Sequence, residues 1–294
     1  MANLKAIRIR IASVKSTRQI TAAMKMVAAA KLRKAQDKIL MLRPYANKLH
    51  EVLMTVCRGL QEAGINSVYS IKPPSEKILV VVITSNRGLC GAFNTNIIRE
   101  ARRVAAEEYN SHYNEGRLFY LTIGKKGYDN LRKQGFSIIG EHNDLLNNLT
   151  FENVSVAADM VINSFLAGEF GKIVLIYNQF KNAAVQNLIN EQYLPFEILP
   201  DDGLEGVPPD YILEPGRNEI IEELIPRYLK IHFYRAVLNS FVAEHGARMT
   251  AMHQATDNAT TMIRDLTLQY NKARQANITS QILEVVSGAE ALKG

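Results

Sequence analysis

The sequence predicts an α/β protein: a long antiparallel coiled coil of N- and C-terminal helices plus a Rossmann-like α/β middle domain. Near both ends, apolar residues recur at alternating spacings of three and four, the pattern of a helix that packs along a partner helix. Between them, runs rich in Val and Ile alternate with helical segments, which is typical of an α/β domain. We predict an N-terminal shaft helix over residues 1–62, an α/β domain over 75–205 and a C-terminal shaft helix over 212–288.

The N-terminal shaft helix is predicted from a run of apolar positions that starts at Leu4 and ends at Leu60. Three successive positions of this run are polar, namely Arg18, Thr21 and Lys25, whereas apolar residues lie beside them at Ile20, Met24 and Val27. We therefore expect the apolar stripe to shift locally around the helix, as it does at a coiled-coil stutter.

The middle domain is predicted from alternating strands and helices. Three buried strands are expected at Glu76–Thr84, Arg117–Gly124 and Lys172–Phe180, with further extended structure over Ala183–Phe196. Helices are expected at Ala92–Tyr109, Lys125–Lys133 and Phe151–Leu166. This alternation favours a largely parallel sheet. The Gly- and Pro-rich stretch Asp201–Pro215 is predicted to be the linker back to the shaft.

The C-terminal shaft helix is predicted from a second run of apolar positions, Ile221 to Ala273. The same spacing then meets Asn277, Ser280 and Glu284, although the helical composition continues. We expect the antiparallel partner to end near Ala273, and residues 274–287 to project as a single helix of roughly 20 Å. Apolar residues of this tail then require a surface on another chain: Ile278, Ile282, Leu283, Val285 and Val286. Two independent helices packed on a globular core remain the alternative.

The sequence shows no motif for catalysis, a cofactor or a metal. The most distinctive loop, Ser85–Asn94, connects a strand to a helix, which is where a nucleotide phosphate can bind. It matches neither glycine-rich nucleotide pattern, so a tight turn with Cys90 as a packing residue is the favoured interpretation. The histidines and cysteines show no metal-ligand spacing, and no catalytic set is evident. We predict no cofactor and no chemistry of the chain's own.

Positive charge is concentrated at the N-terminus. Residues 1–36 contain no acid and nine basic residues: Lys5, Arg8, Arg10, Lys15, Arg18, Lys25, Lys31, Arg33 and Lys34. A solvated helix face is one interpretation, but like charges on neighbouring turns repel. The other interpretation is a positive collar that faces an acidic partner or phosphates. A protein partner is favoured over nucleic acid because no aromatic residues are interleaved for base stacking.

Several segments resemble the gamma subunit of F-type ATP synthases. They are Ile20–Ala29, Arg87–Gly91, Arg248–Met252, Ala255–Ala259, Tyr270–Ala276 and Glu284–Ala289. The resemblance covers nearly the whole chain. It implies a non-catalytic rotor whose shaft lies inside an α3β3 hexamer and whose α/β foot carries the epsilon subunit and rests on a ring of c subunits. It also implies that the chain transmits the rotation of that ring, with no nucleic acid and no direct small-molecule substrate.

The resemblance also implies roles for individual residues. Met24 and Lys25 match the segment that faces an acidic lever of β, and Arg248 matches an arginine coupled to that segment. Arg274, Gln275 and Thr279 match contacts with loops of β. Glu284 matches a nearby carboxylate, and Tyr211 matches the foot near the c ring.

The expected location is the cytoplasmic face of a bacterial inner membrane, as a peripheral protein. The basic, acid-free N-terminus could suggest an organellar transit peptide, but the apolar run passes straight through it.

Two other classes of function are compatible with the residues alone. One is a nucleotide-dependent enzyme built on residues 75–205. The other is a basic coiled-coil scaffold or adaptor protein, including one for nucleic acid. The family motifs favour the rotor over both.

Overall fold

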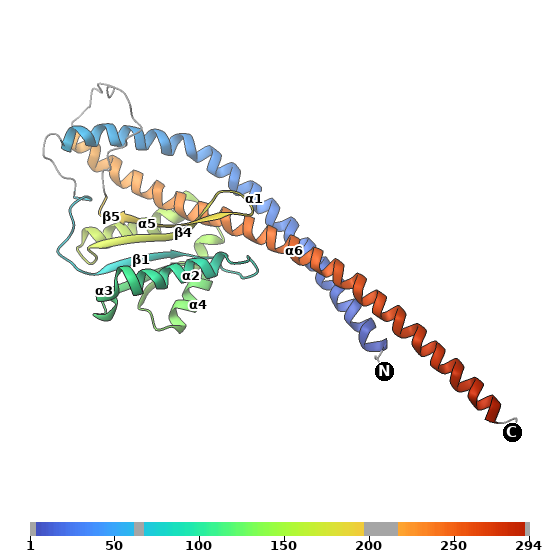
Figure 1. Cartoon of the computed structure of the whole chain (residues 1–294). Helices are drawn as coiled ribbons and strands as arrows, with labels where there is room; N and C mark the ends of the chain where they lie inside the picture. Colours follow the sequence, from blue (N-terminus) through green and yellow to red (C-terminus); the bar gives the residue numbers. More distant parts are fainter. Residues whose placement is uncertain (1–3, 62–67, 197–216, 292–294) are drawn as a thin grey trace. The chain divides into compact units, whose positions relative to one another are not determined.

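The computed structural model describes residues 4–61, 68–196 and 217–291. The chain forms two compact units, one of residues 1–28 with 249–294 and one of residues 29–248. Helices α1 (Leu4–Gln61) and α6 (Arg217–Ala291) each contribute to both units (Figure 1). Across these described ranges, no helix has the length and apolar character needed to cross a membrane.

The larger unit contains a five-stranded sheet in the order β3-β2-β1-β4-β5. The strands are β1 (Ile78–Ile83), β2 (Leu118–Ile123), β3 (Ile138–Glu141), β4 (Lys172–Phe180) and β5 (Gln186–Leu194). The first four strands are parallel, and β5 returns antiparallel to β4. The predicted Rossmann-like, largely parallel sheet is confirmed. Of these five strands only β3 was not predicted, because its alternating half-buried and exposed residues carry no continuous apolar run.

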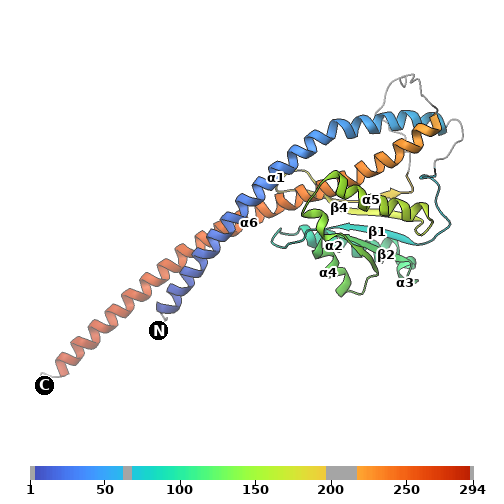
Figure 2. The same ribbon diagram turned by 180° about the vertical axis from the view of Figure 1, so that it is seen from behind.

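Helices cover both faces of the sheet. They are α2 (Phe93–Arg103), which continues into the π-helix η1 (Val104–Glu108), then α3 (Asn110–Asn114), α4 (Lys125–Lys133), the 3-10 helix η2 (Asn143–Leu146) and α5 (Phe151–Leu166). α2 and α4 lie on one side of the sheet and α5 on the other (Figures 1 and 2). Alternate residues of β1, including Val80 and Val82, pack with Phe93 and Ile97 of α2 in the core.

α6 is buried nearly all round between Ile225 and Arg248, because it packs on two surfaces at once. Toward α1, Ile231 clusters with Ala46 and Leu49. Toward the sheet, the backbone carbonyl of Leu229 accepts a hydrogen bond of 2.9 Å from the Tyr193 hydroxyl. A helix that is apolar on all sides is typical of such a central position. Of these two packing surfaces, only the one toward α1 was predicted from the apolar spacing.

The smaller unit is an antiparallel helix pair, in which α1 residues 4–28 lie along α6. Arg8 donates to the Tyr270 hydroxyl at 2.7 Å, and the Thr21 and Thr256 hydroxyls are 2.8 Å apart. As the α1 number rises, the α6 number falls, so the two helices run in opposite directions. The predicted antiparallel coiled coil is confirmed.

The predicted stutter in α1 is wrong. Ile20 and Val27 are 60% and 59% exposed, whereas Thr21 is 9% exposed and lies in the helix interface. The regular spacing therefore continues through its polar positions. Thr21 can remain there because its hydroxyl pairs with that of Thr256, so no buried polar group is left unsatisfied.

Candidate partner-binding surfaces

The last part of α6 is a single helix. Arg8 contacts Tyr270, and the described part of α1 begins one turn earlier, at Leu4, so its pairing with α6 extends to about Arg274. Beyond Ala273 every described residue is exposed except the half-buried Ser280, yet the helix continues to Ala291. The expectation that the shaft ends in an unpaired helix is therefore confirmed.

This single helix has one apolar side, which we call the tail stripe: Ile278, Ile282, Val285 and Val286. Their spacing places them on one side of the helix, and they are 47%, 57%, 72% and 49% exposed. Side chains of this size are normally buried, and a contiguous exposed apolar surface usually marks a contact with another molecule.

The predicted contact residues lie on two different sides of this single helix. Helical spacing puts Arg274, Gln275 and Thr279 on or beside the tail stripe. Glu284 lies on the opposite side, where its carboxylate is 3.5 Å from the Ser280 hydroxyl. If the first three residues contact one partner surface, Glu284 faces a different one.

Lys25 lies in the antiparallel helix pair rather than free in solvent. Its Nζ is 3.4 Å from Nδ1 of His253, and that nitrogen is 3.4 Å from a carboxylate oxygen of Asp257. Met24 is half-buried beside it. His253 and Asp257 were not among the predicted residues, although their spacing of four is that of an interacting pair on a helix.

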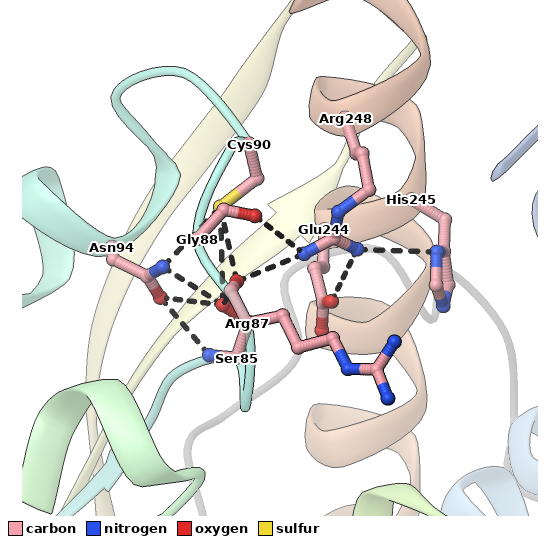
Figure 3. Close-up of polar contacts among 8 residues, drawn as sticks. All are labelled: Ser85, Arg87, Gly88, Cys90, Asn94, Glu244, His245 and Arg248. Carbon is pink, nitrogen blue, oxygen red and sulfur yellow. Dashed lines mark hydrogen bonds and ion pairs between the residues drawn. The ribbon is translucent and has the colours of Figure 1, made fainter. Parts of the chain in front are cut away.

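The loop after β1 is held by Asn94 of α2 (Figure 3). It contains two left-handed residues, Leu89 at φ 63° and Gly91 at φ 59°. The Asn94 side chain accepts from the backbone N–H of Ser85 at 3.0 Å and donates to the Ser85 hydroxyl at 2.8 Å. It also donates to Sγ of Cys90 at 3.2 Å. These bonds close the loop on itself, and burial raises the pKa of the Cys90 thiol.

Arg248 joins α6 to this loop. Its Nη2 donates to the backbone carbonyls of Arg87 at 2.9 Å and Gly88 at 3.3 Å, and its Nη1 donates to the Glu244 carboxylate at 2.5 Å (Figure 3). Arg248 and Glu244 are 8% and 7% exposed. We call Arg248, Glu244 and the two loop carbonyls the arginine joint. The coupling of Arg248 to the segment of Met24 and Lys25 stays a prediction.

The arginine joint also shifts neighbouring pKa values. Burial raises the pKa of Glu244, and the positive charge of Arg248 opposes that rise. Burial together with the charges of Arg248 and Lys31 lowers the pKa of His245 to about 3, so this imidazole is neutral at physiological pH. The ring of His245 packs edge-on against Phe241, with centroids 4.4 Å apart.

The position of the joint is where open α/β sheets usually bind ligands. The loop follows β1, and the strand order reverses between β1 and β4. A phosphate at this point needs backbone N–H groups. Here two backbone carbonyls of the loop instead accept hydrogen bonds from Arg248. The backbone N–H of Ser85 donates to the Asn94 side chain and is not available to a phosphate. The geometry therefore suits an internal connection between sheet and shaft helix better than a nucleotide site.

Two further expectations concern the foot and metals. Tyr211, with the linker Asp201–Pro215, lies outside the described residues.

Among the residues that are described, no group of three or more His, Cys, Asp or Glu side chains is arranged to hold a metal ion.

Comparisons with known proteins identify the family. A protein-family model described as ATP synthase matches residues 3–292. The ATP synthase gamma chain of Flavobacterium johnsoniae is 52% identical over 294 residues, covering 100% of both chains.

Solved structures agree in fold. A chain of the Euglena gracilis mitochondrial ATP synthase (OSCP/F1/c-ring) has a TM-score of 0.69 and 22% identity, covering 98% of this chain and 94% of its own. A chain of the Tetrahymena thermophila mitochondrial ATP synthase (central stalk/c-ring) has a TM-score of 0.58 and 26% identity, and the match covers 80% of this chain and 99% of the Tetrahymena chain. The chain therefore belongs to the family of ATP synthase gamma chains.

Proposed function

We propose that this chain is the central-stalk rotor subunit of the F1 sector of a proton-translocating ATP synthase. In that role it transmits the rotation of a c ring to an α3β3 hexamer and catalyses no reaction itself. The observation that carries the proposal is the end of the shaft, where a helix pair continues as a single helix with an exposed apolar side. The membership of the gamma-chain family supports it.

The single helix beyond Ala273 is suited to drive a cycle of conformational states in its partners, because one side of it is apolar and the other is polar. A part that holds no ligand can shift the states of a partner only if it contacts those states differently. The tail stripe offers apolar side chains in one direction, whereas Glu284 and Ser280 offer polar groups in another. As the shaft turns, each β subunit in succession would meet these different surfaces.

The energy to be transmitted sets a mechanical requirement. A proton that crosses the membrane supplies about 2.3 kcal/mol per 100 mV, so the rotation must sum several crossings for each ATP. The shaft therefore has to resist twisting relative to the sheet domain that the c ring turns. The arginine joint suits this requirement, because a buried, charged and hydrogen-bonded contact binds α6 to the loop after β1.

The partner surfaces follow from this role. Arg274, Gln275 and Thr279 would contact β beside the tail stripe, with Glu284 on another face, and Met24 and Lys25 would meet an acidic segment of β. The α/β domain, with Tyr211, would carry the epsilon subunit and rest on the c ring. The chain would be peripheral, on the cytoplasmic face of a bacterial inner membrane.

Reconstitution tests the proposal. The complete ATP synthase containing this chain is assembled in vesicles, and proton-driven ATP synthesis is compared between the wild type and the pair Arg274→Ala with Gln275→Ala. We expect the pair to reduce synthesis, while the matched change Gln269→Ala, at an exposed position on the paired part of α6, leaves it near the wild-type level.

Two results would refute the proposal at different levels. Normal synthesis by the Arg274 and Gln275 variant would refute the contact roles. A complex that retains proton-driven ATP synthesis when this chain is omitted would refute the rotor itself.

A further inference from the structure

A cavity of about 350 Å³ lies within the larger unit, between α1, the turn that precedes α5, and α6. We call it the lysine groove. The residues that matter for its chemistry are Lys31, Lys34 and Lys38 of α1, Asn147 and Asn148 of the turn, and Phe241 of α6. Its volume falls at the lower end of the range of roughly 300–1,000 Å³ that is typical of small-molecule sites.

The α1 wall of the groove is positively charged. The three lysines are spaced by three and four residues, so they lie on one side of the helix and repel one another. Lys38 donates to the backbone carbonyl of Leu149 at 2.8 Å and so forms part of the wall. Lys31 and Lys34 are exposed.

No residue that lines the groove is acidic. The positive charge of Lys31 does act on Glu244, but that carboxylate is buried and already paired with Arg248. The groove therefore has an excess of positive charge that an anionic ligand would neutralise.

The remaining walls limit the kind of anion. Asn147 and Asn148 also line the groove and are exposed, and amide side chains can donate hydrogen bonds to an anion. One N–H of Asn147 points to the Asp144 carboxylate at 3.4 Å, which leaves its second N–H for a ligand. Lysine ammonium groups commonly bind phosphate as point charges. Phe241 is half-buried and provides an aromatic surface against which a planar ring can pack, with the fully buried Leu238 beneath it. A purely ionic ligand would leave that apolar part unused.

We propose that the lysine groove binds a nucleoside phosphate, with its phosphates between Lys31, Lys34 and the asparagine side chains and its base against Phe241. The site is distinct from the loop after β1, and the ligand is bound rather than converted. Because its walls come from α1, α6 and the turn before α5, an occupied groove would hold the shaft helices and the α/β domain together more firmly. This ligand is not part of the rotor function proposed above, and neither proposal depends on the other.

Calorimetric titration of the purified full chain tests the site. ATP, tripolyphosphate and adenosine are the probes, at low and moderate salt. We expect ATP to bind more tightly than tripolyphosphate and adenosine to bind weakly, because both the charges and the ring contribute. The variant Lys31→Gln with Lys34→Gln should weaken ATP binding by about tenfold or more.

The matched control removes the same amount of charge elsewhere on α1. Arg10→Gln with Lys15→Gln changes two exposed basic residues that lie at least four helical turns before Lys31 on α1, so salt screens them from the groove, and it should alter ATP affinity by less than about twofold. Equal losses in both variants would show only general attraction to a basic chain and would overturn the site.

Two other outcomes also contradict the proposal. Equal affinities for ATP and tripolyphosphate would exclude the contact between base and Phe241. A glutamate-rich peptide that binds this groove more tightly than ATP does would show that the occupant is an acidic protein segment instead.

Discussion

Replacing Arg248 by methionine should strongly destabilise the larger unit. The change keeps much of the side-chain volume but removes the hydrogen bonds to Glu244, Arg87 and Gly88. It also leaves the Glu244 carboxylate, which is only 7% exposed, without its cation. Loss of one partner of a buried ion pair typically costs about 3–5 kcal/mol. Adding Glu244→Gln removes the unpaired charge, so the double variant should recover a large part of that loss.

The loss should also depend on pH. Burial already raises the pKa of Glu244, and removing Arg248 removes the charge that opposes this rise. The folded variant then holds a proton that the unfolded chain releases above its ordinary carboxyl pKa, so its stability decreases as the pH rises. The free energy lost relative to wild type should therefore be larger at pH 8 than at pH 5.

Urea unfolding of the full chain, followed by circular dichroism at both pH values, measures these effects. The matched control is Arg235→Met, another arginine of α6 that is exposed. A loss of less than about 1 kcal/mol for Arg248→Met, equal at the two pH values and equal to that of the control, would contradict the buried arginine joint.

Three further outcomes follow from the same structure. His245→Gln should flatten the pH dependence of stability between about pH 6.5 and pH 3. In that range the unfolded chain binds a proton at His245 that the folded chain does not, so the wild type loses stability as the pH falls. Unfolding measured across this pH range checks the prediction. Thr21→Val with Thr256→Val should preserve or raise the melting temperature, since replacing both partners of a buried hydrogen bond by groups of the same shape is nearly neutral or stabilising; a large decrease would contradict the proposed pairing. Ile278→Ser with Ile282→Ser should leave the melting temperature of the isolated chain nearly unchanged but impair assembly or coupling in the complex; a clear loss of stability in the isolated chain would show that the stripe packs internally.

Much of the fold is predictable from the sequence because its signals are local. The Val- and Ile-rich β1 and the helix α5 were expected at almost their observed positions. The end of the helix pairing near Ala273 was also predictable, because the apolar spacing of α6 ends there, level with the described start of α1.

The features that the sequence did not predict depend on contacts between residues far apart in the chain. Thr21 was interpreted as a break in the interface, because apolar spacing carries no information about a hydrogen bond to Thr256 on a distant helix. The second packing surface of α6 was missed because a helix that is apolar on all sides has no distinct periodicity. The arginine joint connects α6 to the loop after β1. These two segments are far apart in the chain, so no local sequence motif predicts the contact.

Direct observation of rotation tests the central claim most directly. The complete F1 complex containing this chain is immobilised through its β subunits, and a bead is attached to the exposed helix α3 of this chain. During ATP hydrolysis we expect the bead to turn in one direction, with three pauses per revolution, one for each β subunit. A bead that stays stationary while the complex hydrolyses ATP at its normal rate would contradict the rotor.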